Sequence, residues 1–159
     1  MDVRIRPMAE RDRETVVALL GELNAFEFTL SDDRTLDPAD WRALLHKHEA
    51  DLAAKGSHLL VAEDAGAVIG YCALIFEHDE PLYVRAEHRP HGRVTDLVVR
   101  KAARGSGVGR ALLRRAEQLC REAGLAAMAI GALAENRTAI GLYRSEGFQV
   151  QAIELLKRL

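Results

Sequence analysis

A strand, a glycine-rich loop and a helix follow one another in the second half of the chain. Residues 94–123 read VTDLVVRKAARGSGVGRALLRRAEQLCREA. The run Val94–Val99 is apolar, as in a buried strand. After the loop, apolar positions recur at helical spacing, at Val108, Leu112, Leu113, Ala116, Leu119, Cys120 and Ala123. Glycines let a backbone approach a ligand closely, and the first amides of a helix have no intrahelical partner, so this stretch predicts a cradle for a phosphate group.

The spacing of the glycines separates several kinds of phosphate-binding loop. A Rossmann G-x-G-x-x-G pattern fails, because the sixth position is Arg110 when counted from Gly105 and Leu112 when counted from Gly107. A P-loop closes on Gly-Lys followed by Ser or Thr, whereas Gly109 is followed by Arg110. The pattern that remains is Arg-x-x-Gly-x-Gly, in Arg104-Gly105-Ser106-Gly107-Val108-Gly109.

A second motif follows about thirty residues later, where residues 136–148 read NRTAIGLYRSEGF. Asn136 is suited to cap a helix that ends at Gly147, and Tyr143 lies on the apolar face of that helix. The two motifs together resemble the GNAT superfamily, the acetyl-CoA-dependent N-acetyltransferases. The family's closing element is Asn-x-x-Ala-x-x-Leu-Tyr-x-x-x-Gly-Phe, and its fourth strand leads into an Arg-x-x-Gly-x-Gly loop.

The remaining elements follow a compatible order. We expect strands over residues 3–6, 58–63, 68–76, 94–99 and 125–130, and closing strands over Phe148–Val150 and Ala152–Leu156. Helices are expected over residues 16–23 and from the N-cap Asp37 to Gly56. The resemblance implies one α/β (α+β) domain over residues 1–159, with a central mixed, mostly antiparallel twisted sheet flanked by helices.

The resemblance also implies a site for acetyl-CoA as the acetyl donor. In the family, pantetheine lies between the splayed fourth and fifth strands, along a backbone that corresponds here to Leu97, Val98 and Val99. The other implied cofactor contacts are Arg104, Gly105, Ser106, Gly107, Val108, Gly109, Arg110, Asn136 and Tyr143. Many members carry a proline and a bulky residue before the loop, where this chain has Arg-Lys-Ala-Ala over residues 100–103. That difference affects adenine packing and leaves the amide donors in place.

Acetyl transfer to an amine requires removal of the amine proton, a donor for the developing oxyanion and an acid for the leaving sulfur. By resemblance, the amide of Val98 serves the oxyanion and Tyr143 protonates the thiolate. A phenol with an ordinary pKa of about 10 stays protonated at neutral pH. Asp96 is two residues before Val98 and therefore shares its strand face. Two roles for Asp96 stay open: the base, or a carboxylate that binds the ammonium or orients the strand, with a water chain as the base.

The acceptor is expected to be a primary amine of a small molecule, because acidic and aromatic residues gather in two candidate walls, residues 22–28 and 79–83. A protein N-terminus or a lysine is the alternative acceptor. A different class of function is a sensor module that binds acetyl-CoA without catalysis. Such a module needs the phosphate cradle and no proton donor, so the presence of Tyr143 favours an enzyme.

Composition excludes several other classes of function. The 159 residues are 48% hydrophobic and carry a formal charge of −2, so we expect one core and no nucleic-acid partner. Arg110, Arg114 and Arg115 are interpreted as the solvated face of a helix. Residues 1–13 lack an apolar signal core, and the apolar run over residues 125–134 is too short to span a bilayer, so no membrane association is expected. A homodimer is left open.

Cysteine and histidine spacing predicts no metal site. Cys72 and Cys120 lie in apolar patterns without pairing or metal spacing, and we interpret them as buried free thiols of a cytoplasmic protein. The His-x-x-His pattern of His88 and His91 has no third ligand at a defined spacing. His46 and His48 are two residues apart on an expected helix, point in different directions and form no pair.

Overall fold

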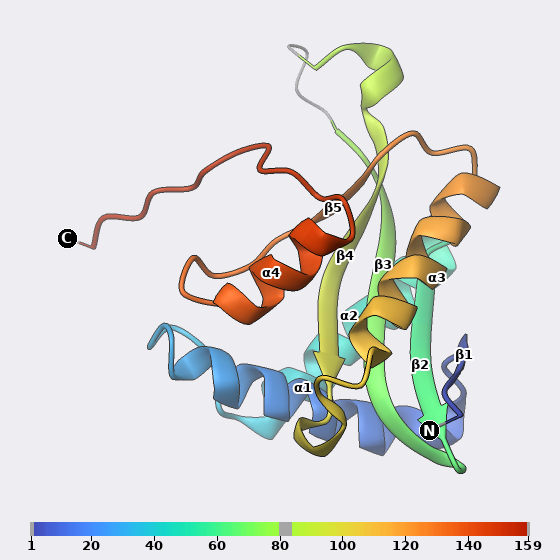
Figure 1. The fold of residues 1–159 in the computed structure, drawn as a ribbon, viewed down its shortest axis with the longest axis vertical. Helices are drawn as coiled ribbons and strands as arrows, with labels where there is room; N and C mark the ends of the chain where they lie inside the picture. The colour runs from blue at the N-terminus through green and yellow to red at the C-terminus, as the bar shows by residue number, and fades with distance from the viewer. Residues whose placement is uncertain (1, 80–83, 159) are drawn as a thin grey trace.

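Five strands form one sheet in a computed structural model that describes residues 2–79 and 84–158. The strands lie in chain order: β1 (Arg4–Pro7), β2 (His58–Asp64), β3 (Ala67–His78), β4 (Pro90–Val99) and β5 (Met128–Ile130). β4 and β5 are parallel, and the other neighbours are antiparallel (Figure 1). The expectation of a mixed, mostly antiparallel sheet is confirmed.

Helices cover both faces of this sheet (Figure 1). α1 (Arg13–Phe28) and α2 (Pro38–Lys55) pack on one face, and α3 (Val108–Glu122) and α4 (Arg137–Ser145) pack on the other. Short 3-10 turns, η1 (Glu10–Asp12), η2 (Ala86–His88) and η3 (Lys101–Ala103), lie between these elements. Neighbouring residues set both ends of α2. The Asp37 carboxylate accepts a hydrogen bond from the Ala39 amide at 2.8 Å, and Gly56 ends the helix with a φ of 66°.

Strand alternation divides the core into two apolar layers. On β2, Leu59 and Val61 face α1 and α2, whereas Leu60 and Ala62 face α3. The β2–β3 hairpin turns at Ala65 and Gly66, both with positive φ, as the glycine in its sequence predicts. Cys72 and Cys120 are buried free thiols in the layer beneath α3, as expected.

A bulge in β4 has consequences for the site. Ala73 pairs with Asp96, but the next residue of β3, Leu74, pairs with Val94, so Thr95 is an extra residue on β4. The pairing of β4 with β5 ends at Val94 opposite Ile130. Beyond this point β4 has no partner on that side within the described sheet, and its edge is open to an extended ligand.

Several expected boundaries were wrong. The closing strands over 148–150 and 152–156 do not form: residues 149–158 leave α4 without helix or strand, and Ile153 and Leu155 are 79% and 90% exposed. Alternating apolar residues give a segment the capacity to pair, but a strand forms only where a sheet edge meets it. β5 is shorter than expected because the amide of Leu125 still closes α3 by bonding to Cys120, and α1 runs five residues past Leu23 to Phe28.

Candidate active site

The backbone of β4 beyond the bulge offers amides to the open edge. The Arg100 amide donates to the Ile69 carbonyl of β3 at 2.8 Å. Peptide groups alternate in direction along a strand, so the Val98 amide also points to β3, whereas those of Leu97 and Val99 point to the open edge. This direction conflicts with the expectation that Val98 supplies the oxyanion donor. Without the bulge the Val98 amide would point to the open edge, and those of Leu97 and Val99 would point to β3. The sequence does not show the bulge, so it did not reveal the direction of these amides.

The glycine loop presents helix amides without intrahelical partners. Gly105 and Gly107 have φ values of 79° and 90°, a region that L side chains rarely adopt. The amide of Ala111 bonds to the Gly107 carbonyl at 3.0 Å, so residues 108–110 precede the hydrogen-bond ladder of α3. The structure therefore has the positive-φ glycines and the unpaired helix amides on which the predicted anion cradle depends.

Contacts within the loop fix its shape. Arg104 donates from Nε to the Val99 carbonyl at 3.0 Å, and its guanidinium lies 5.5 Å from the centre of the Phe26 ring on α1. The Ser106 hydroxyl donates to the Ala103 carbonyl at 2.6 Å. Two predicted phosphate-loop side chains thus brace the backbone, and the loop's amides remain the groups directed to a ligand.

The start of α3 packs closely on α4. A Cβ added to Gly109 would lie 3.2 Å from Leu142 Cδ2, so glycine permits this approach. Arg110 and Arg114 pair with Glu146, the residue that caps the end of α4, through Nε–O distances of 2.5 and 2.9 Å. These arginines link two helices and are more than a solvated helix face. The side chain of Arg110 is engaged, which leaves its amide as its contribution to the cradle.

A cavity of about 180 Å³ lies where β4 leaves β5. Its walls come from the end of α1, the bulged part of β4, the loop after β5, and α4. Four expected site residues line it together: Asp96, Leu97, Asn136 and Tyr143. Val98 does not line it, because its side chain is 3% exposed and packs in the layer beneath α1 and α2.

Asn136 and Tyr143 keep the local roles that their motif predicts. The Asn136 side-chain oxygen caps α4 by accepting from the Ala139 amide at 3.1 Å. The Tyr143 ring lies 5.9 Å from the Phe148 ring, and no described residue hydrogen-bonds to its hydroxyl. Burial, with smaller effects of Cys72 and Glu27, raises the pKa of Tyr143 to about 12. The hydroxyl is therefore protonated across the physiological range and available to the cavity.

The side of the cavity formed by the end of α1 is charged. Leu23, Asn24 and Glu27 line it, all within residues 22–28, and Arg34 joins them. Arg34 Nε donates to Glu27 Oε2 at 2.8 Å. The second expected wall, residues 79–83, lies outside the described residues except for its first position.

The sequence did not predict the partner of Asp96. His48 on α2 is 2% exposed, and its Nε2 lies 3.0 Å from Asp96 Oδ2. Its Nδ1 lies 3.0 Å from the hydroxyl of Tyr71 on β3. A histidine on an otherwise apolar helix face was the available signal, but only the packing of α2 on the sheet supplies its two partners. The expectation that His46 points elsewhere is confirmed, since its side chain is 82% exposed.

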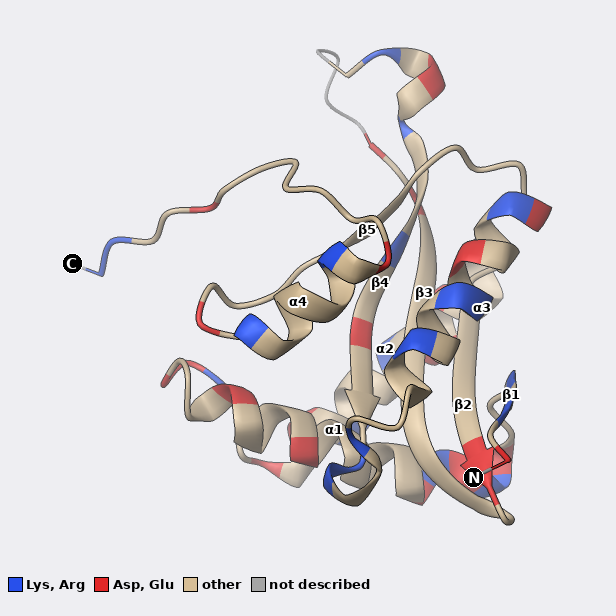
Figure 2. Ribbon diagram, in the orientation of Figure 1, with Lys and Arg blue, Asp and Glu red and all other residues tan. Residues whose placement is uncertain are grey.

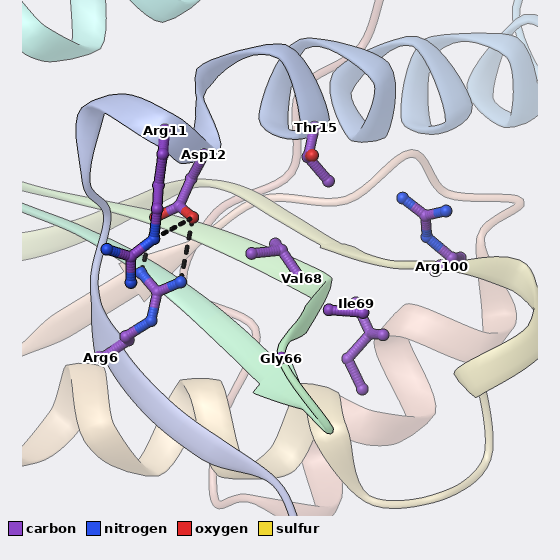
Figure 3. Close-up of a pocket in the computed structure, with 9 residues that line it drawn as sticks. Arg6, Arg11, Asp12, Thr15, Gly66, Val68, Ile69 and Arg100 are labelled. Carbon is purple, nitrogen blue, oxygen red and sulfur yellow. Dashed lines mark hydrogen bonds and ion pairs between the residues drawn. The ribbon is translucent and has the colours of Figure 1, made fainter.

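A larger cavity, about 380 Å³, lies between the β2–β3 turn and the start of α1 (Figure 3). Arg6 is held there by Asp12 at 2.6 Å and Glu63 at 2.5 Å. The hydrogen bonds that Arg6 donates to Asp12 raise the pKa of Arg6 despite burial, and the same bonds lower the pKa of Asp12. None of the expected site residues lines this cavity. Four of the expected site residues line the smaller cavity instead.

Within residues 2–79 and 84–158, no group of three or more His, Cys, Asp or Glu side chains has the geometry of a metal site. In the same ranges, every helix is too short or too polar to span a bilayer.

Known proteins match this chain along most of its length. The sequence model of the Acetyltransferase (GNAT) family matches residues 20–148. The chain is 35% identical over 136 residues to the IAA acetyltransferase of Azospirillum brasilense, an alignment covering 86% of this chain and 78% of that protein. The chain belongs to the GNAT family of acetyltransferases.

Solved structures carry the same GNAT fold at low sequence identity. A mutant of the BH1408 protein from Bacillus halodurans has a TM-score of 0.82 at 20% identity, with 98% of this chain and 99% of that one covered. The aminoglycoside antibiotic 6'-N-acetyltransferase of Acinetobacter haemolyticus has a TM-score of 0.74 at 20% identity, with the same coverage of 98% and 99%. The family match ends at Phe148, so the tail that lacks the expected strands lies beyond it.

Proposed function

We propose that this GNAT protein transfers the acetyl group of acetyl-CoA to the primary amine of a small molecule, by direct attack in a ternary complex. One observation carries the proposal: Asp96, Asn136 and Tyr143, from β4 and α4, line a single cavity at the open edge of β4. A carboxylate and a protonated phenol at one site suit the base and the acid that acetyl transfer to an amine requires, and the amide of Asn136 suits the pantetheine arm.

The donor set of this chain suits acetyl-CoA. Amides at the start of α3 suit its pyrophosphate, and the open edge of β4 suits an extended, amide-containing arm. Figure 2 marks basic residues in the loop between β4 and α3, and acidic residues on α1 and in the middle of β4. The basic end suits phosphates and the acidic end suits an ammonium. When bound, acetyl-CoA supplies the acyl group as a thioester.

Each residue then has a role that follows from its position. The Leu97 and Val99 amides are the donors that β4 directs to its open edge, so we assign the oxyanion contact to Leu97, which lines the cavity. Tyr143 holds a proton at its hydroxyl for the leaving sulfur. The Asn136 oxygen is used by the helix cap, and its amide hydrogens are available to the pantetheine arm.

Asp96 is proposed to take the amine proton, directly or through water. An Asp96→Asn variant preserves the shape and removes the charge. We expect a lower kcat/KM whose residual value rises with pH, because solvent then takes over deprotonation. If Asp96 only attracts the ammonium, KM rises, kcat holds and the pH profile keeps its shape. A variant that matches the wild type in pH–rate profiles contradicts both roles.

The dimensions of the cavity favour a small acceptor. Its volume of about 180 Å³ lies below the roughly 300–1,000 Å³ typical of drug-sized ligand pockets. Glu27 and Asp96 suit an ammonium, and Arg34 adds a cation that suits a carboxylate or hydroxyl group on the same acceptor. We therefore expect amines of amino-acid or short polyamine size to be favoured.

The direct test is acetyl-CoA turnover against panels of small amines, amino acids, aminoglycosides and peptides, followed by thiol release and by mass spectrometry of the product. The proposal requires a small amine that gains one acetyl group and for which Tyr143→Phe lowers turnover. If only peptide N-termini or lysines were acetylated, the acceptor would be a protein and not a small molecule. Acetyl-CoA binding without turnover on any panel would favour a sensor.

A further inference from the structure

A hydrogen-bonded chain of three polar side chains crosses the core behind the candidate site. Tyr71 on β3 is 0% exposed and its hydroxyl lies 3.0 Å from His48 Nδ1. His48 on α2 is 2% exposed, and its Nε2 lies 3.0 Å from Asp96 Oδ2. Asp96 is 12% exposed at its side chain and lines the cavity. The chain runs from the buried core to the place where the acceptor amine is proposed to lie.

The chemistry of the three groups fixes the direction of each hydrogen bond. An ionised carboxylate only accepts, so Nε2–H of His48 donates to Asp96. In a neutral ring Nδ1 is then the acceptor, and the Tyr71 hydroxyl donates to it. Burial, and next the Asp96 charge, raises the pKa of Tyr71, which keeps that hydroxyl protonated. One arrangement of donors and acceptors therefore satisfies all three side chains.

Fold stability alone explains poorly why these three side chains are hydrogen-bonded in the core. Buried polar groups contribute little stability over well-packed apolar residues of the same volume, because removing them from water is costly. The chain is also asymmetric: it begins in the apolar layer beneath α1 and α2, and it ends on the one member that reaches the cavity. His48 engages Oδ2 of Asp96, which leaves Oδ1 as the oxygen for a ligand.

We propose that His48 is a positioning residue. It donates from Nε2 to Oδ2 and directs Oδ1 of Asp96 into the cavity, while Tyr71 donates to Nδ1 of the histidine. This inference rests on the proposed function of Asp96, which would act on the acceptor amine.

The charged and titratable groups around His48 are few among the described residues. Glu49, its neighbour on α2, is paired with Arg13 of α1. On β3, Tyr71 is flanked by the buried thiol Cys72, whose pKa is raised by burial. Across the cavity, Tyr143 and Glu27 face Asp96 from α4 and α1. None of these offers His48 a second carboxylate, so its hydrogen bonding is set by Asp96 and Tyr71.

A first experiment needs no substrate. Long-range ¹H–¹⁵N spectra of histidine-labelled protein report which ring nitrogen carries the proton, and we expect Nε2 of His48 to be the donor and Nδ1 the acceptor. In Tyr71→Phe the proton should stay on Nε2, because Asp96 still requires a donor. At constant pH the carboxyl ¹³C chemical shift of Asp96 should change in His48→Leu, because the hydrogen bond to Oδ2 is lost. A proton on Nδ1 alone, or an unchanged Asp96 chemical shift, overturns the proposal.

A second experiment uses turnover on the acceptor found in the panel. His48→Gln should lower kcat/KM for the amine about tenfold and leave KM for acetyl-CoA unchanged. In the Asp96→Asn background the same substitution should change kcat/KM less than twofold, because a residue that acts through Asp96 has nothing left to position. An equal loss in both backgrounds identifies a structural role and overturns the proposal. His46→Gln, on the same helix with its side chain 82% exposed, is the matched control.

The two experiments separate two kinds of failure. If no acceptor is acetylated, the proposed function fails, while the tautomer of His48 and the carboxyl chemical shift of Asp96 still decide whether His48 engages Asp96. If transfer occurs and Asp96→Asn has no effect, Asp96 has no role for His48 to support, and the positioning proposal fails by itself. His48→Gln retains a side-chain amide donor, so the cycle remains measurable even where His48→Leu folds poorly.

Discussion

Removing the Tyr143 hydroxyl tests the assignment of the acid. Tyr143→Phe keeps the ring that packs 5.9 Å from Phe148 and removes only an oxygen to which no described residue hydrogen-bonds. We therefore expect the thermal midpoint to change little, since no internal hydrogen bond is lost.

The expected loss of activity follows from the raised pKa. Tyr143 has a pKa of about 12, whereas a thiol ordinarily has one of about 8.5. Complete proton transfer to a free thiolate would then be uphill by roughly 3.5 pKa units, or about 5 kcal/mol. The hydroxyl is thus expected to act mainly as a hydrogen-bond donor to the developing thiolate, a contact that contributes about 1.5–3 kcal/mol. That range corresponds to a fall in kcat of roughly ten- to 150-fold.

The pH dependence gives a second readout. A phenol whose folded pKa is raised stays in its acid form until the pH approaches that higher value, and it loses the proton above it. With a pKa of about 12, Tyr143 should produce no falling limb of kcat up to about pH 10.5. An ordinary phenol would already be half ionised near pH 10.

The assay is thiol release at saturating acetyl-CoA, with cofactor affinity measured by calorimetry. Phe148→Leu is the control, because it disturbs the packing of Tyr143 and keeps its hydroxyl. This variant should lower the thermal midpoint clearly and change kcat little. A Tyr143→Phe protein with wild-type kcat would refute the reasoning and return Tyr143 to a packing role.

Three further outcomes are expected from the same structure. Gly107→Val should weaken acetyl-CoA binding at least tenfold by calorimetry, about 1.4 kcal/mol, whereas Gly124→Val, which also has positive φ but lies at the far end of α3, should lower stability and leave that affinity unchanged. Asn136→Ala should remove the helix cap, at a cost of about 1 kcal/mol of stability, and raise KM for acetyl-CoA. Asn136→Asp should restore the thermal midpoint and leave KM raised. Recovery of both quantities in Asn136→Asp would contradict a separate role for the amide group. Asp12→Asn should destabilise the fold by roughly 3 kcal/mol at neutral pH, because Arg6 loses one of its two carboxylate partners. The pKa of Asp12 is lowered in the folded protein, so the difference in denaturation midpoint between the variant and the wild type should persist above a pH of about 4 and shrink as the pH falls further.

Local sequence carried much of the fold. The αL glycines of the loop, the Asn136 cap and the β2–β3 turn each depend on residues within a few positions of one another. A cap or a positive φ has the same physical cause in any fold, so such features are readable before the tertiary structure is known. The strand, loop and helix over residues 94–123 are of this kind, and so are the unpaired amides of the proposed phosphate cradle.

Sequence order also brought part of the site together correctly. Asp96, Asn136 and Tyr143 were expected at one place from the motifs, and they line one cavity. The motif residues occupy fixed positions on two elements of a known arrangement, so their meeting needed only the order of the elements.

What the sequence could not determine were features set by pairing between distant segments. The extra residue Thr95 reverses which amides of β4 face the open edge, and only the register against β3 reveals it. The closing strands fail for the same reason, because alternation in residues 148–156 says nothing about whether an edge is within reach.

The sequence by itself thus determined the strand–loop–helix cradle and the capped closing helix, because backbone conformation and capping are decided by neighbours in the chain. Only the tertiary structure decided the direction of the β4 amides and the chain from Tyr71 through His48 to Asp96. Those three residues come from β3, α2 and β4, and their hydrogen bonds exist only because α2 packs against the sheet in one register. Side chains that are distant in sequence have no local signal for one another, since their contact depends on the packing of whole elements.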